Sequence, residues 1–446
     1  MKKRVIICLS MVIVALAAIG VGVYFFLFNT PKNIFVKAVN NSINELMEDG
    51  KSTLLGNIDY KTLKVTTDTK VDATVSDQKY NVALTGDFAF DKSNNKMSTA
   101  LSILGNNQKI LDLEALLENS KIYFKIPDLM KTFYFNDLGF DTSKTISKDD
   151  IKYLRELALK EFFDSLDNKD FIKSKEKLDL DGNVPTVKLS LELDEQKAKD
   201  ISIRILEKIK SDEESMKILQ KLNKDIKETN IDEALKTIKE TKADGGESLI
   251  YTIYVAKGDR IVRHEFAPKS KSDSEANKYK VLIDSYKNSD GYKTRKLAAV
   301  EDGKDLATFE VKGTSKTDSV ITINVAGMVS GEGTLVRKDN EESVSLAISM
   351  SGIKLGDIKA SIVKDADKKF TCNLAINSNI PGTLNATISS SDKLSFDEAL
   401  TPVDVTGSKD IKEMTQTEMQ IIENTITQRI MKAFPTLVKT ASNLNL

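Results

Sequence analysis

Residues 63–75 (LKVTTDTKVDATV) and 80–90 (YNVALTGDFAF) decide the fold that this sequence predicts. In both stretches apolar and polar residues alternate at nearly every position. Successive side chains of a strand point to opposite faces, so the alternation predicts two strands, each with one buried and one solvated face. Strands that follow one another through short turns predict an antiparallel meander. Further strands are expected near 97–104, 108–117, 121–126 and 132–136.

Helical spacing of apolar residues interrupts the strands. An amphipathic helix of about four turns is expected from Pro31, which can open a helix, to a stop at Gly50. Other helices are expected at 148–166, in the charged stretch 195–241 and at 410–434, with strands at 186–193 and about 247–391. The order helix, strands, helix thus appears twice. The predicted domains are a cytoplasmic tip and anchor (1–30), a first helix and sheet unit (31–244) and a second unit (245–446).

Residues 5–28 (VIICLSMVIVALAAIGVGVYFFLF) form an uncharged apolar run behind Lys2, Lys3 and Arg4. A helix of this length reaches about 36 Å, whereas the hydrocarbon core of a bilayer is about 30 Å thick. Basic flanking residues stay cytoplasmic, so the bulk of the chain is expected to be extracellular. The alternatives are a cleaved signal peptide, whose apolar core is usually shorter, and a lipoprotein. The expected localisation is the cell membrane, with a single N-terminal span that acts as a signal anchor.

Composition argues against several classes of function. The 65 Lys and Arg balance the 66 Asp and Glu, which does not favour nucleic-acid binding. The chain has one histidine, His264, which we interpret as a satisfied, partly buried side chain. Of the two cysteines, Cys8 falls in the apolar run, so Cys372 is expected to form no disulfide within the exported part. We interpret Cys372 as a small buried hydrophobe rather than a reactive thiol. No zinc, phosphate-loop or dinucleotide motif occurs, so no cofactor, metal ligand or catalytic residue is predicted.

Aromatic residues concentrate in residues 122–135 (IYFKIPDLMKTFYF). Apolar side chains at this density suit the lining of a ligand cavity, and they also suit a core where a sheet meets a helix. The candidate cavity-lining residues are Tyr123, Phe124, Ile126, Leu129, Met130, Phe133 and Phe135.

Several of these elements together resemble the LolA/LppX-like lipoprotein fold. They are the membrane-proximal helix, the long alternating strands, SKIYFKIP (120–127), the 148–166 helix and PTVKLSLEL (185–193). The whole chain also resembles an uncharacterised family of membrane-anchored proteins from clostridia and their relatives. The resemblance implies an α+β fold: after the transmembrane helix come two curved antiparallel half-barrels with helices on their concave sides. In characterised relatives that concavity carries acyl chains.

The leading hypothesis is a membrane-tethered extracytoplasmic protein without catalytic activity. It would act as a binding or scaffold module that holds a lipid or another hydrophobic ligand in a curved-sheet cavity. One alternative is a structural or protein-interaction component of the cell envelope, which docks a partner through strand edges or the 195–241 helices. A second alternative is a hydrolase with a carboxylate-based site. The absence of tryptophan and the aromatic content of 7% argue against a carbohydrate-cleaving enzyme.

Overall fold

The computed structural model describes residues 30–435 with gaps at 52, 56–57, 76–77, 95, 119–120, 137–146, 223–225, 244–245, 271–277, 381–383 and 401–402. It divides into two compact units that interleave along the sequence. Unit 1 comprises Met1–Thr53 and Ile146–Glu332, and unit 2 comprises Leu54–Thr145 and Gly333–Leu446. The predicted domains, 31–244 and 245–446, divide the chain at a different place, because strand pairing joins segments far apart in sequence.

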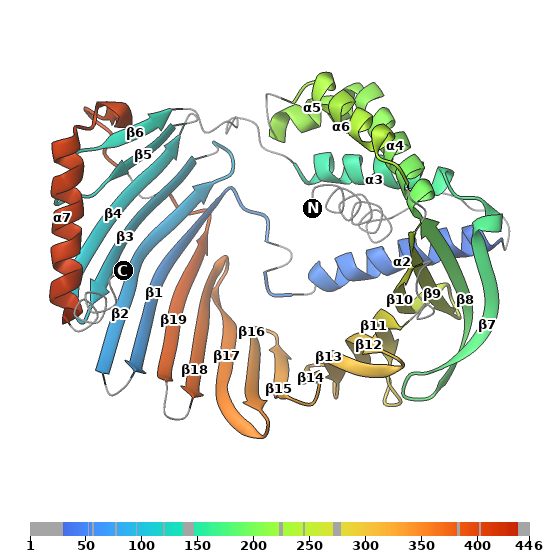
Figure 1. Cartoon of the computed structure of the whole chain (residues 1–446). Helices are drawn as coiled ribbons and strands as arrows, with labels where there is room; N and C mark the ends of the chain where they lie inside the picture. The colour runs from blue at the N-terminus through green and yellow to red at the C-terminus, as the bar shows by residue number, and fades with distance from the viewer. Residues whose placement is uncertain are drawn as a thin grey trace. The chain divides into compact units, whose positions relative to one another are not determined.

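Unit 1 is an antiparallel meander with helices packed against it (Figure 1). From β7 to β14, each strand pairs with the next one along the chain. The strands are β7 (Phe171–Asp179), β8 (Asn183–Asp194), β9 (Glu247–Ala256), β10 (Arg260–Ser270), β11 (Tyr279–Lys287), β12 (Lys293–Glu301), β13 (Lys304–Gly313) and β14 (Asp318–Val325). The helical elements are α2 (Pro31–Lys51), α3 (Lys148–Asp164), η1 (Asn168–Asp170), α4 (Glu195–Ser211), α5 (Glu213–Leu222) and α6 (Glu228–Glu240). The unit boundary falls within β15 (Val329–Lys338).

Unit 2 is a sheet assembled from both ends of the chain. Its neighbours in order are β16, β17, β18, β19, β1, β2, β3, β4, β5, β6 and β20, and all are antiparallel except β6 and β20. Its first strands are β1 (Thr62–Val75), β2 (Gln78–Asp91), β3 (Lys96–Gly105), β4 (Gln108–Glu118), β5 (Lys121–Lys125) and β6 (Phe133–Asn136). Its later elements are β16 (Glu341–Met350), β17 (Ile353–Ala366), β18 (Lys369–Ile380), β19 (Leu384–Phe396), β20 (Lys409–Asp410), η2 (Ile411–Glu413) and α7 (Gln416–Ala433), which packs beside β4 (Figure 1).

The core of unit 1 forms around α2. The helix begins at Pro31, and the Thr30 hydroxyl accepts a hydrogen bond from the Asn33 amide at 3.3 Å, which satisfies one free N–H of the first turn. Phe35 is fully buried, with ring-centroid distances of 5.0 Å to Phe171, 5.6 Å to Tyr251 and 6.4 Å to Phe163. Aromatic rings at these separations add attraction beyond the area that they bury. Side chains of α2, α3 and α4 therefore cover the sheet face over β7–β10.

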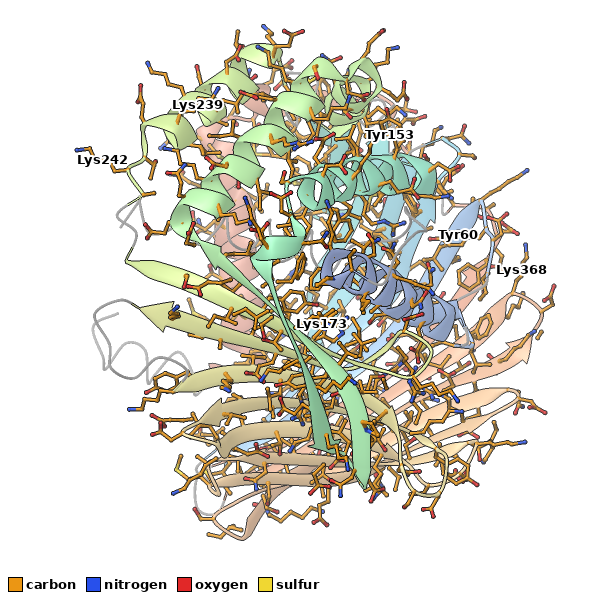
Figure 2. The ribbon with its side chains drawn as sticks, turned by 90° about the vertical axis from the view of Figure 1, so that its right-hand side faces the viewer. Tyr60, Tyr153, Lys173, Lys239, Lys242 and Lys368 are labelled. Atoms are coloured by element: carbon orange, nitrogen blue, oxygen red, sulfur yellow. The ribbon has the colours of Figure 1, made fainter. Side chains whose placement is uncertain are left out.

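The helices α3–α6 pack against one another as a helical layer of unit 1, and polar surface pairs connect them. Tyr153 of α3 donates a hydrogen bond to the Asp212 carboxylate between α4 and α5, at 3.0 Å. Lys239 of α6 forms an ion pair with Glu207 of α4 at 2.7 Å. Figure 2 shows Tyr153 and Lys239 at the surface of this layer. The charged stretch 195–241 thus forms solvated helix faces, as its pattern predicts.

The predicted fold class is wrong. The sequence pattern led to two LolA/LppX-like half-barrels, whereas the twenty strands of the described residues belong to one hydrogen-bonded sheet. Alternation identifies a strand but carries no information about its partners. Here β1 pairs with β2 on one side and with β19, more than three hundred residues later in the chain, on the other.

The predicted membrane topology also requires correction. In the part of the chain that the structure describes, no helix has both the length and the apolar character needed to cross a membrane. The expected anchor, within residues 1–28, lies outside the described residues. The single-pass cell-membrane localisation and the signal anchor are not retained.

Candidate functional site

The aromatic segment named from the sequence forms a stack on β5 and β6 of unit 2. The Phe124 ring lies 5.1 Å from that of Phe135 and 6.4 Å from that of Phe133. Phe133 is buried, whereas Phe135 is 43% exposed. Tyr123 follows the strand alternation to the opposite face, where its ring lies 5.8 Å from that of Tyr134. The structure thus brings together three of the seven named residues.

The other three named residues occupy the turn between β5 and β6. The amides of Leu129 and Met130 both donate to the Ile126 carbonyl at 2.9 Å, and all three side chains are half-buried. Their conformation is set by backbone hydrogen bonds within the turn, so they do not continue the phenylalanine stack. The role of these seven residues as a cavity lining stays a prediction.

A larger apolar surface lies in unit 1, on one face of β11–β14. Cross-strand neighbours place His264, Ile283, Leu297, Phe309 and Ile323 in one row across five strands. A second row, two residues along each strand and therefore on the same face, contains Phe266, Val281, Ala299, Ala307 and Val325. We call the part of both rows on β11–β14 the open apolar face: Val281, Ile283, Leu297, Ala299, Ala307, Phe309, Ile323 and Val325.

Large side chains of the open apolar face are in contact with solvent. Leu297 is 47% exposed, Phe309 44%, Val281 42%, Val325 39% and Ile283 38%. Single exposed hydrophobic residues are common, whereas a contiguous exposed set is typical of a surface that contacts a ligand, a membrane or another protein. The face also leaves few backbone groups for a peptide strand to pair with, because β11, β12 and β13 are hydrogen-bonded on both sides.

The opposite face of the same strands carries paired charges. Arg263 donates two hydrogen bonds to Asp284, at 2.6 and 2.8 Å, and the neighbouring carboxylate raises the pKa of this guanidinium. On the same face Lys280 pairs with Glu265 at 2.9 Å. A shift of one residue in register would exchange these charges with the apolar rows, so the pairs help to hold the register that exposes the open apolar face.

A small cavity continues the open apolar face toward α2. Its volume is about 150 Å³. A cavity of that size in a protein core accepts a benzene-sized apolar group. Its apolar lining consists of Ile261, Ile283, Leu297 and Phe309. The polar side chains around it include Ser42, Glu45, His264, Lys293 and Arg295.

His264 borders the cavity as a neutral side chain. Burial lowers the pKa of His264 to about 4, well below the usual 6.5. The Tyr251 hydroxyl lies 2.8 Å from Nδ1, and the Ser42 hydroxyl lies 3.4 Å from Nε2. Burial also raises the pKa of Tyr251 far above its ordinary value, so the tyrosine is a neutral partner. The sequence-based interpretation of His264 as a satisfied, partly buried histidine is confirmed.

This serine and histidine pair does not have the geometry of a hydrolase. In a catalytic triad a carboxylate orients the imidazole through Nδ1 and stabilises its protonated form. Here a tyrosine hydroxyl occupies that position, and an imidazole with a pKa near 4 is a weak base at neutral pH. The arrangement can orient a polar group of a ligand, but it lacks the charge that would activate Ser42.

A second depression in unit 1, of about 490 Å³, is polar and internally paired. Lys197 forms an ion pair with Asp170, and its amide donates to Asp194 at 2.7 Å. Gln196 donates to Asp200 at 2.6 Å. Across the described ranges no group of three or more His, Cys, Asp or Glu side chains could hold a metal ion. This depression therefore offers no binding chemistry comparable to that of the open apolar face.

Sequence reasoning missed the open apolar face. The alternation in β14 was visible, since Ile321, Ile323 and Val325 share one face. What the pattern could not show is that α2 packs over β7–β10 and leaves the same face of β11–β14 exposed. The sequence does contain one relevant signal. It predicts many amphipathic strands and few amphipathic helices, so the helices are too few to cover the apolar face of every strand.

Comparison with known proteins gives no family. No family model and no curated protein matches the chain. Similar solved structures include the translocator domain of the autotransporter NalP from Neisseria meningitidis, at 8% identity and TM-score 0.19, covering 80% of this chain and 96% of that one. A triple mutant of the Rhodopseudomonas blastica porin has 5% identity and TM-score 0.21, covering 75% and 99%. The outer membrane protein Omp33 of Acinetobacter baumannii has 6% identity and TM-score 0.18, covering 76% and 98%.

These three likenesses are too weak to support an argument about fold or function. TM-scores near 0.2 do not establish a shared arrangement of strands. None of the three is a LolA/LppX-like lipoprotein, and the resemblance to a clostridial family stays a prediction.

Proposed function

We propose that the protein is a non-catalytic binding protein that holds an apolar ligand, such as the acyl chain of a lipid, on the open apolar face of unit 1. The observation that carries the proposal is the set of five large hydrophobic side chains, each exposed by 38% or more, in two adjacent cross-strand rows. The cavity beside α2 would take the end of the chain, and the rows would support the rest.

The energy available is sufficient for binding. If each of the five side chains loses roughly 70 Å² of exposed surface, covering them stabilises the complex by about 9 kcal/mol. Lost translational and rotational freedom offsets a large part of this gain. A flexible acyl chain suits the site because the apolar rows contain no hydrogen-bonding side chain apart from His264 at their α2 end. An apolar protein helix would need the same surface, so capture of a protein without binding of an acyl chain would contradict the proposal.

The test is displacement of a fluorescent fatty acid, cis-parinaric acid, from the purified full chain by hexadecanol. Leu297→Asp places a carboxylate in the centre of the face, and we expect it to weaken binding roughly tenfold or more, because the charge must be desolvated under the chain. Ile172→Asp is the matched control, since Ile172 is 72% exposed on β7 and lies outside the open apolar face. Far-UV circular dichroism checks that both variants fold.

Equal affinities for the wild type and the Leu297→Asp variant would contradict the proposal. Absence of any binding by the wild type would do the same. Mass spectrometry of an organic extract of the purified chain provides a second readout. A bound lipid should be extracted from the wild type and from the Ile172→Asp control, but not from the Leu297→Asp variant.

A further inference from the structure

We infer that the free edge of β7 binds an extended acidic segment of a partner protein, which adds to the sheet of unit 1 as a further strand. The inference does not depend on the open apolar face. That face lies on β11–β14, whereas β7 is the first strand of the same meander.

β7 is an edge strand in the part of the chain that the structure describes. It pairs with β8 from Phe171, opposite Leu191, to Asp179, opposite Asn183, and with no other described strand. Backbone N–H and C=O groups on the outer side of such a strand are available to an added strand. The six consecutive residues 172–177 are exposed, so no described element covers the middle of this edge. Figure 2 shows Lys173 on this strand.

Both ends of β7 are anchored in the core of unit 1. Phe171 is buried, and its ring lies 5.0 Å from that of Phe35. Leu178, near the other end, is buried in a second apolar cluster with Tyr254 and Val262. Pairing with β8 holds the residues between these anchors in an extended conformation. Little conformational freedom is therefore lost on this side when a strand is added, which favours binding.

Three lysines line one face of the exposed stretch. Lys173, Lys175 and Lys177 alternate along β7, so their side chains leave the same face at intervals of about 7 Å. The carboxylate of this stretch, Glu176, lies on the other face and pairs with Lys188 of β8 at 3.2 Å. None of the three lysines has an ion-pair partner among the described residues. Carboxylates on an added strand would lie directly opposite them, and such cross-strand pairs stabilise a sheet.

These charges distinguish between possible partners. A second copy of this chain that added its own β7 antiparallel would place lysine opposite lysine, and like charges in that position destabilise a strand pair. Lysines on an edge commonly prevent self-association in this way. The other face of the stretch carries Ile172, which is largely exposed. A segment that alternates acidic with apolar residues therefore complements both faces of the edge.

The probe is a fluorescein-labelled peptide of about nine residues that alternates glutamate with valine, and fluorescence anisotropy measures its binding to the full chain. We expect saturable binding that weakens at high salt. The triple variant Lys173→Glu, Lys175→Glu, Lys177→Glu should bind this peptide at least about tenfold more weakly, because three attractive cross-strand pairs become repulsive. The same variant should bind a peptide that alternates lysine with valine. Far-UV circular dichroism checks that the variant folds.

Two controls separate strand pairing from charge alone. A glutamate peptide with its central valines replaced by proline keeps its charge but cannot complete the hydrogen-bond ladder, so it should not bind. The triple variant Lys242→Glu, Lys257→Glu, Lys304→Glu has the same change of charge at exposed positions off β7, so it should bind the glutamate peptide as the wild type does.

Three results would each overturn this inference. Equal binding of the proline peptide would mean that the lysines attract any polyanion, such as a nucleic acid, without strand pairing. Absence of peptide binding by the wild type would exclude the docking site itself. An unchanged affinity in the β7 variant would exclude the lysines as its basis. All three results leave the proposed binding of an apolar ligand intact.

Discussion

Acidification should destabilise unit 1 through a single residue, His264. In the folded chain burial lowers the pKa of this imidazole to about 4, whereas an unfolded chain has the ordinary value of about 6.5. The unfolded state therefore binds the proton more readily. The stabilising contribution is fully present above pH 6.5 and is lost as the pH falls through the folded pKa. From these two pKa values, the free energy of unfolding is lower by about 2 kcal/mol at pH 5 and by about 3 kcal/mol at pH 4 than at neutral pH.

The measurement is practicable because the chain has one histidine. Labelling histidine with ¹³C at Cε1 gives one NMR signal, whose midpoint should lie near pH 4. Urea unfolding followed by far-UV circular dichroism between pH 7 and pH 5 gives the stability change. The matched variant is His264→Gln, which keeps a polar side chain but does not titrate. Between pH 7 and pH 5 its free energy of unfolding should fall by about 2 kcal/mol less than that of the wild type.

Protonation of carboxylates changes the free energy of unfolding mainly below pH 5, and it does so equally in the wild type and in the His264→Gln variant. The comparison with the variant therefore isolates the imidazole. A histidine signal that titrates near pH 6.5 would refute the reasoning, as would an identical pH dependence in the wild type and the variant. Either result would mean that water reaches the ring freely through the cavity.

Three further predictions concern stability. Phe35→Ala, in the fully buried centre of the unit 1 core, should lower the free energy of unfolding by about 3–5 kcal/mol, and urea unfolding measures the change. Asp284→Ala leaves Arg263 charged, largely buried and without its carboxylate, which should cost about 3–5 kcal/mol, whereas replacing both residues with leucine should restore much of the loss. Gly86→Ala would place a Cβ 2.0 Å from the carbonyl oxygen of Ala100 at a φ of +148°, so thermal unfolding should show a clear loss of stability in unit 2; an unchanged melting temperature would contradict the close approach.

Local structure was predictable where side-chain pattern and backbone agree. The alternation over 63–75 and 80–90 corresponds to β1 and β2, and the helical spacing from residue 148 corresponds to α3. Ser147 and Asp150 form a capping box at the start of α3, with hydrogen bonds of 2.8 and 2.9 Å, which explains why the helix begins there.

Pairing and exposure were not predictable from these patterns. The register between Val71 of β1 and Ile388 of β19 depends on two strands that the local sequence does not relate. Exposure of Leu297 and Phe309 depends on where α2 lies on the sheet, and an apolar residue in an alternating strand has the same pattern whether or not a helix covers it. Cys372 is half-buried rather than fully buried, and burial raises the pKa of its thiol, which agrees with the expectation that it is unreactive.

The interleaving of the two units has a consequence for how the protein is made. The strands β7–β14 are consecutive, so this part of the meander can form as the chain leaves the ribosome. In unit 2, β1 pairs with β19, so one edge of the fourteen-residue strand β1 has no partner until residues 384–396 have been synthesised. Unsatisfied edges of this length recruit other chains, and contacts between distant segments form slowly. Premature termination in the last strands should therefore produce aggregates rather than a shortened soluble product.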